Sequence, residues 1–103
     1  MNTYELLVGA RDVFARRGGV KNELEDDNGN VCALGAINVA LTGKATWSWG
    51  GFSEDIYLFD EVSTLLTEAI NGDIITYNNR SDVTKEDVLA VYDKAIAGLE
   101  EKA

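Results

Sequence analysis

The feature that most constrains the fold is a long apolar segment, residues 31–41, which reads VCALGAINVAL. It is too long and too rich in alanine for a strand, and it is apolar on nearly every side. Such a helix is stable only when other elements cover it, so we expect a buried central helix that ends at Gly43. The segment is also well short of the roughly 20 residues that a membrane span needs, so we expect no membrane association.

Three further helices are expected to pack around this centre, over residues 2–17, 53–70 and 84–99, where apolar residues recur at helical spacing. The chain contains no proline, which favours helices over a fold rich in tight turns. The connection 73–82 carries apolar residues and could be extended or a single turn. The expected capping residues are Asn2 with Glu5, Ser53, and Thr84 with Asp87.

A β-hairpin is expected between the first two helices. Val20, Asn22 and Leu24 could alternate between two faces, and the Asn-Gly sequence at residues 28–29 suits the positive φ angles of a tight hairpin turn. The return strand must be short, because the central helix follows at once. The sequence therefore predicts an α+β, predominantly helical fold, with about four helices around a central apolar helix and one short β-hairpin. A chain of 103 residues fits a single domain, 1–103.

The chain contains no histidine, which removes a Ser-His-Asp triad, a Cys-His pair and every histidine-containing metal site. No glycine-rich phosphate loop is present. We interpret Cys32 as an ordinary buried thiol, because its neighbours are apolar. Residues 26–30 are acidic like the start of an EF-hand calcium loop, but Gly35 occupies the position where that pattern requires glutamate. We therefore expect no catalytic, cofactor-binding or metal-binding residues, and we favour a non-enzymatic protein.

The net charge is −9, from nine basic and eighteen acidic residues, which makes direct nucleic-acid binding improbable. The charge serves solubility, or else it attracts a basic partner. One cysteine allows no intrachain disulfide, and the N-terminus lacks the basic region of a signal peptide, so we expect a cytoplasmic protein.

Two segments are candidates for an interaction surface. The first, residues 47–52, combines three aromatic residues with two glycines, and the second, residues 77–80, is an aromatic–Asn–Asn–Arg sequence. Aromatic residues are enriched at binding hot spots, but both segments could equally be structural, the first as a lid on the core and the second as a loop tied by asparagine side chains. The candidate residues are Trp47, Trp49, Phe52, Tyr77, Asn78, Asn79 and Arg80.

The sequence resembles DUF6197, a family of small uncharacterised proteins of actinobacteria and their phages. The resemblance rests on the helix end at residues 15–19, the DNGNVCALGA block at 27–36, and residues 77–96 with their TKEDVL sequence. The family usually has Trp-Asn-Asp where this chain has Tyr77-Asn78-Asn79. The resemblance implies a bacterial or phage origin, but no activity.

Three functions follow as hypotheses. The first is a non-enzymatic interaction or regulatory protein, such as a phage accessory protein that acts on a host protein. The second is a small-molecule-binding domain or small enzyme with a pocket near Trp49 and Asn78. The third is an acidic nucleic-acid mimic, which requires Glu23, Glu25, Asp26 and Asp27 to line one face. A homodimer is also possible, because an exposed aromatic loop can be a dimer contact.

Overall fold

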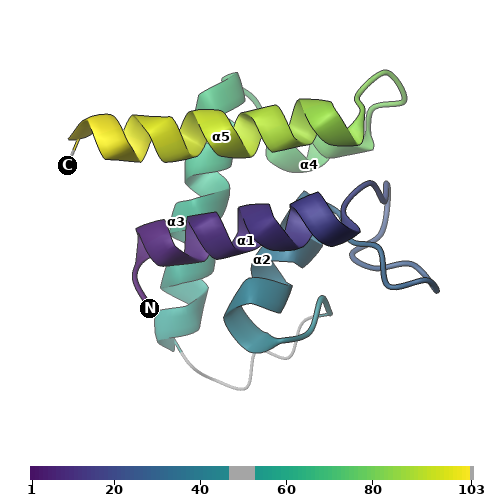
Figure 1. Ribbon diagram of the computed structural model, residues 1–103, viewed down its shortest axis with the longest axis horizontal. Coiled ribbons are helices and arrows are strands. Elements are labelled where there is room, and N and C mark those ends of the chain that lie inside the picture. The colour runs from purple at the N-terminus through teal and green to yellow at the C-terminus, as the bar shows by residue number, and fades with distance from the viewer. Residues whose placement is uncertain (47–52, 103) are drawn as a thin grey trace.

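The computed structural model describes residues 1–46 and 53–102, which contain five α-helices (Figure 1). Helices α1 and α5 run antiparallel and side by side, and α3 crosses both of them. The N-terminus and the end of α5 therefore lie on the same side of the molecule. The helices are α1 (Thr3–Arg17), α2 (Ala33–Thr42), α3 (Ser53–Ile70), α4 (Ile74–Asn79) and α5 (Lys85–Lys102).

Capping fixes where the outer helices begin. The Asn2 side chain accepts a hydrogen bond from the Glu5 N–H (2.8 Å), and the Glu5 carboxylate accepts one from the Asn2 N–H (3.0 Å). Thr84 and Asp87 exchange the equivalent pair of bonds, at 2.9 and 3.2 Å, at the start of α5. These two predicted caps are confirmed, and each satisfies N–H groups that a first helical turn otherwise leaves unpaired. The third predicted cap, Ser53, is the first residue of α3, and the residue before it lies outside the described ranges.

Helix α2 is buried at the centre of the fold, as its apolar sequence predicted. All residues from Ala33 to Asn38 are buried, and α2 contacts α1, α3 and α4. The helix ends at Gly43, whose φ of 86° provides the left-handed conformation of a C-terminal stop. None of the helices in the two described ranges is long and apolar enough to cross a membrane.

The segment between α1 and α2, residues 18–31, is called the arm below. The predicted β-hairpin and α+β class are wrong: the described residues contain no β-strand, and the fold is all-α. Pairing is limited to isolated bridges that join Val31 to Gly18 and to Glu25. The chain enters α2 directly after this point, and Asn22 adopts a left-handed φ of 66°, so neither side extends far enough for a ladder.

The tip of the arm is nevertheless a tight turn, as its Asn-Gly sequence predicted. Gly29 has a φ of 82°, and the Asp26 carboxylate accepts hydrogen bonds from the N–H groups of Asn28 and Asn30, both at 2.9 Å. The Arg17 guanidinium then holds the turn against the end of α1 by donating to the Gly29 carbonyl (2.6 Å). Bonds from side chains to backbone thus replace the strand ladder.

The connection 73–82 contains a short helix, α4, which raises the number of helices from the expected four to five. Asp73 begins it, because its carboxylate accepts hydrogen bonds from both the N–H (3.3 Å) and the hydroxyl (2.8 Å) of Thr76. Ile74 is buried in the core, whereas Ile75 faces outward. This helix lies beside the arm and the start of α2, where it forms one side of the site described next.

Candidate functional site

One buried asparagine joins the arm, α2 and α4. Asn78, at the end of α4, is only 4% exposed. Its side-chain oxygen accepts a hydrogen bond from the Ala33 N–H at the start of α2 (3.1 Å). Its side-chain nitrogen donates to the Val20 carbonyl of the arm (3.0 Å) and to the Asn79 side-chain oxygen (3.1 Å). Every polar atom of this side chain is therefore used, and three separate elements are held together.

A lysine on the arm closes the same junction from the other side. The Lys21 ammonium donates to three backbone carbonyls, those of Asn78 (2.8 Å), Arg80 (2.6 Å) and Val83 (2.7 Å). These carbonyls lie at and beyond the end of α4, where a helix leaves acceptors unpaired and favours positive charge. The arm is therefore fastened to the α4 end by a charge-assisted contact as well as by Asn78.

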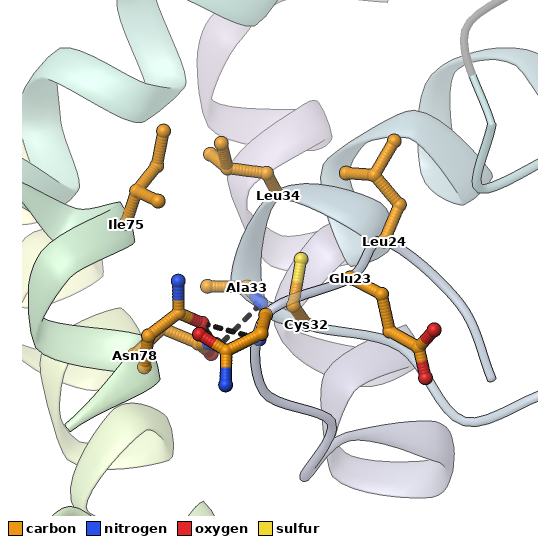
Figure 2. Close-up of a pocket in the computed structure, with 9 residues that line it drawn as sticks. Glu23, Leu24, Cys32, Ala33, Leu34, Ile75 and Asn78 are labelled. Atoms are coloured by element: carbon orange, nitrogen blue, oxygen red, sulfur yellow. Dashed lines mark hydrogen bonds between the residues drawn. The ribbon is translucent and has the colours of Figure 1, made fainter.

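Above this junction the protein has an open cleft of about 280 Å³, which we call the arm–α4 cleft (Figure 2). Figure 2 shows Ile75 on one side and Leu24 on the other, with Leu34 and Cys32 between them. The floor is therefore apolar, and the polar groups come from the arm and from the end of α4. The lining residues are Asn22, Glu23, Leu24, Cys32, Ala33, Leu34, Ile75, Asn78 and Asn79.

Cys32 is 8% exposed and is the N-cap of α2, where its sulfur accepts a hydrogen bond from the Gly35 N–H (3.3 Å). The expectation of a buried thiol is confirmed. The sulfur also lines the arm–α4 cleft, so the single cysteine of the chain lies at the floor of the candidate site.

The rim of the arm–α4 cleft exposes apolar surface that the fold itself does not use. Ile75 is 48% exposed, although its neighbour Ile74 is 2% exposed and belongs to the core. Adjacent residues on a helix point in different directions, so a short helix that buries one of them presents the other to solvent. Ile75 therefore adds exposed apolar surface directly beside the apolar floor of the arm–α4 cleft.

The candidate interaction surface from the sequence is brought together only in part. Asn78 and Asn79 line the arm–α4 cleft, whereas Tyr77 lines a separate groove between α3 and α5. Arg80 is exposed, pairs with Asp82 (2.5 Å), and lies 5.9 Å from the centre of the Tyr77 ring. The hydrogen bond from Arg80 lowers the pKa of the Asp82 carboxyl. The remaining candidates, Trp47, Trp49 and Phe52, lie outside the described residues.

The acidic residues of the arm differ in how far they are engaged. Glu25 pairs with Arg17 (2.7 Å). Asp26 is part of the arm's own turn, and the hydrogen bonds it accepts there, the one from Asn30 first, lower the pKa of its carboxyl. Glu23 and Asp27 are exposed, and within residues 1–46 and 53–102 their carboxylates have no hydrogen-bond or ion-pair partner. Two of the four carboxylates are therefore free to face a partner.

A tyrosine supports the floor of the arm–α4 cleft from inside the core. Tyr92 of α5 is fully buried, packs against Phe14 with ring centres 5.9 Å apart, and donates its hydroxyl hydrogen to the Ala33 carbonyl (2.7 Å). Burial, with a smaller effect from the nearby Cys32, raises the pKa of Tyr92 well above its ordinary value of 10.0.

This shift predicts a specific loss of stability in alkali. Above pH 10.0 the unfolded chain releases the Tyr92 proton while the folded chain keeps it, so the free energy of unfolding falls as pH rises. The fall is up to about 1.4 kcal/mol per pH unit. We expect Tyr92→Phe to cost about 1 kcal/mol at neutral pH and to remove this part of the slope. The free energy of unfolding can be measured by urea unfolding of both proteins below and above pH 10.0. If it falls equally with pH in the wild type and in Tyr92→Phe, the prediction is contradicted.

A second, shallower groove lies at the other end of α1. It is lined by residues of α1, α3 and α5, and its most exposed member is Tyr57 (67%). Some of the carboxylates near this end of α1 are already engaged, because Glu61 accepts a hydrogen bond from the Thr3 hydroxyl and Glu100 accepts one from Tyr4 (2.9 Å). The 15 residues of α1 separate this groove from the arm, by about 20 Å at 1.5 Å per residue. A substitution at Tyr57 can therefore serve as a control that leaves the arm–α4 cleft unchanged.

Sequence reasoning missed three of the residues that make the site: Lys21, Leu24 and Ile75. For Ile75 a signal was present, because two consecutive isoleucines on a six-residue helix cannot both face the core. Lys21 was the single basic residue in an acidic arm, which also sets it apart. Leu24 was assigned to one face of a strand that does not form.

No curated protein and no solved structure matches the chain. A family model described as a family of unknown function, DUF6197, matches residues 1–98, which is nearly the whole chain. The chain therefore belongs to the DUF6197 family.

Proposed function

We propose that this protein is a non-enzymatic binding module that acts by engaging another protein through the arm–α4 cleft. The observation that carries the proposal is the combination of a preformed apolar hollow with the half-exposed Ile75 at its rim. Apolar side chains that fill such hollows are the usual anchors of protein interfaces. If the protein is a phage product, as the family resemblance suggests, the partner is a host protein in the bacterial cytoplasm.

The rigidity of the walls supports this proposal. Asn78 and Lys21 use their polar groups entirely within the junction, so the arm–α4 cleft exists before a partner arrives. A preformed site loses little conformational entropy on binding, which leaves more of the contact energy for affinity. The asparagines of residues 78–79 thus act by positioning the cleft, and contact with the partner falls to Ile75 and Leu24.

A small-molecule site remains the second candidate, because Asn78 does line a cleft. Its volume of about 280 Å³ is just below the range of pockets that hold small molecules, which are roughly 300–1,000 Å³. A single side chain of a partner suits an open hollow of this size better. The nucleic-acid mimic has less support, because Glu25 and Asp26 are already engaged within the arm.

The test is comparative affinity purification from an actinobacterial lysate. Three forms are immobilised: the wild type, Ile75→Glu, and Tyr57→Ala as the distant control. We expect at least one protein to be retained by the wild type and by Tyr57→Ala and lost with Ile75→Glu, because the substitution places a charge at the apolar rim. Identical sets of retained proteins for all three forms, or no retained protein, would contradict the proposal.

A further inference from the structure

Most of the charged residues around the arm–α4 cleft belong to the arm, which has one lysine and four acidic residues. Helices α2 and α4 carry no charged residue, and Asp73, which precedes α4, is engaged as its N-cap by the N–H and hydroxyl of Thr76. Arg80, just beyond α4, is paired with Asp82, and Arg17 is paired with Glu25. The Lys21 ammonium is held by three backbone carbonyls. The cleft therefore has neutral walls on two sides and a negative rim on the third.

Within that rim, Glu23 is the charged residue that itself lines the arm–α4 cleft. Its carboxylate is exposed and, in the described ranges, has no partner inside the protein. The whole chain adds to the same sign with its net charge of −9. A partner that brought a carboxylate or phosphate to this rim would be repelled, whereas a lysine or arginine would be attracted and oriented.

We infer that the arm–α4 cleft recognises a partner segment in which a large aliphatic or aromatic residue stands next to a lysine or arginine. The apolar side chain enters the hollow between Ile75 and Leu24, and the basic group meets Glu23 at the rim. This inference rests on the proposed function and specifies the chemistry of the partner. The apolar contact provides most of the affinity, and the charge selects among segments and speeds association.

The experiment uses a displayed library of random linear peptides, selected against the immobilised full chain at low salt. Enriched peptides are then synthesised, and their affinities are measured for the wild type, Ile75→Glu and Glu23→Lys. We expect the enriched peptides to share an apolar residue beside a basic one. Both substitutions should weaken binding at least about tenfold, since the first removes apolar burial and the second reverses the rim charge.

One control variant and two further measurements show where the peptide binds. Asp60→Lys makes the same change of charge on exposed α3 surface, away from the arm–α4 cleft, and should leave binding nearly unchanged. Cys32 is the single cysteine and lies at the cleft floor, so a bound peptide should slow its reaction with a thiol reagent. A new selection against Glu23→Lys should enrich acidic residues in place of basic ones.

The outcomes separate this inference from the proposed function. Suppose that enriched peptides lose binding with Ile75→Glu but lack basic residues, or bind Glu23→Lys as well as the wild type. The preference for a basic residue, which we call the charge rule, is then overturned, while the proposed binding site is supported. If Glu23→Lys and Asp60→Lys weaken binding equally, the attraction is due to total charge and the rule is also overturned. If no peptide is enriched, or enriched peptides bind Ile75→Glu as tightly as the wild type, both proposals fail.

Discussion

Gly35→Ala is expected to lower the free energy of unfolding by about 3 kcal/mol or more, because the added methyl group has no space. A Cβ at this position would lie 2.2 Å from the Leu24 carbonyl oxygen and 3.2 Å from the Cβ of Val31. The Leu24 carbonyl is backbone and already accepts a hydrogen bond from the Cys32 N–H (3.2 Å), so it cannot move without breaking the arm away from α2.

The matched control is Gly98→Ala, inside α5 and four residues before its end, where an added Cβ meets nothing within 4 Å. Alanine is the better helix former, so this substitution should raise stability by about 0.5–1 kcal/mol. Urea unfolding followed by circular dichroism measures both proteins. A loss below 1 kcal/mol for Gly35→Ala would show that the arm does not need this close contact. Peptide binding should disappear together with the stability, since Leu24 forms one wall of the arm–α4 cleft.

Asn78→Asp is the second substitution with a large expected effect. We expect it to lower the free energy of unfolding by about 3 kcal/mol or more at neutral pH. The change keeps an acceptor for the Ala33 N–H but removes the donor to the Val20 carbonyl and to Asn79. A buried carboxylate would then face two oxygens, which leaves the Val20 carbonyl unpaired and desolvates a charge. Burial raises the pKa of such a carboxyl, so the deficit should shrink as pH falls and protonation restores a donor.

The adjacent substitution Asn79→Asp provides the control, because it is the same chemical change with the opposite expectation. Within residues 1–46 and 53–102, the Asn79 side chain uses its oxygen alone, which accepts hydrogen bonds from the Asn22 N–H (2.7 Å) and from the Asn78 side chain (3.1 Å). An aspartate keeps both acceptors, so stability should change by less than about 1 kcal/mol. If the two variants lose equal stability, the different hydrogen-bonding roles of Asn78 and Asn79 are contradicted.

The parts of the fold that the sequence predicted well are the parts decided locally. The Asn2–Glu5 cap needs only residues three apart, the stop at Gly43 needs only a left-handed glycine, and the burial of α2 follows from its apolar periphery. The hairpin was predicted from equally local signals and failed, because distant contacts decide the course of the arm. Lys21 and Asn22 bond to residues 78–83, and these bonds bend the arm away from an extended path.

The site was predicted only in part for a related reason. Residues 78 and 79 stood out as part of an aromatic–Asn–Asn–Arg segment, and they do line the arm–α4 cleft, but their hydrogen bonds are internal. Leu24 and Ile75, which form opposite sides of the cleft, are ordinary apolar residues whose exposure depends on how α4 docks. No spacing rule connects positions 24 and 75, because the arm and α4 meet only through tertiary structure.

The hydrogen bonds from Lys21 to the end of α4 affect when the cleft can form during translation. Its three carbonyl acceptors lie 57–62 residues further along the chain. At roughly 5–20 residues per second, a ribosome adds that length in about 3–12 s. A nascent chain that ends after α2 therefore lacks these three contacts between Lys21 and the end of α4. Because the last acceptor belongs to Val83, just before α5 begins, the arm–α4 cleft cannot be completed before residue 83 has been added.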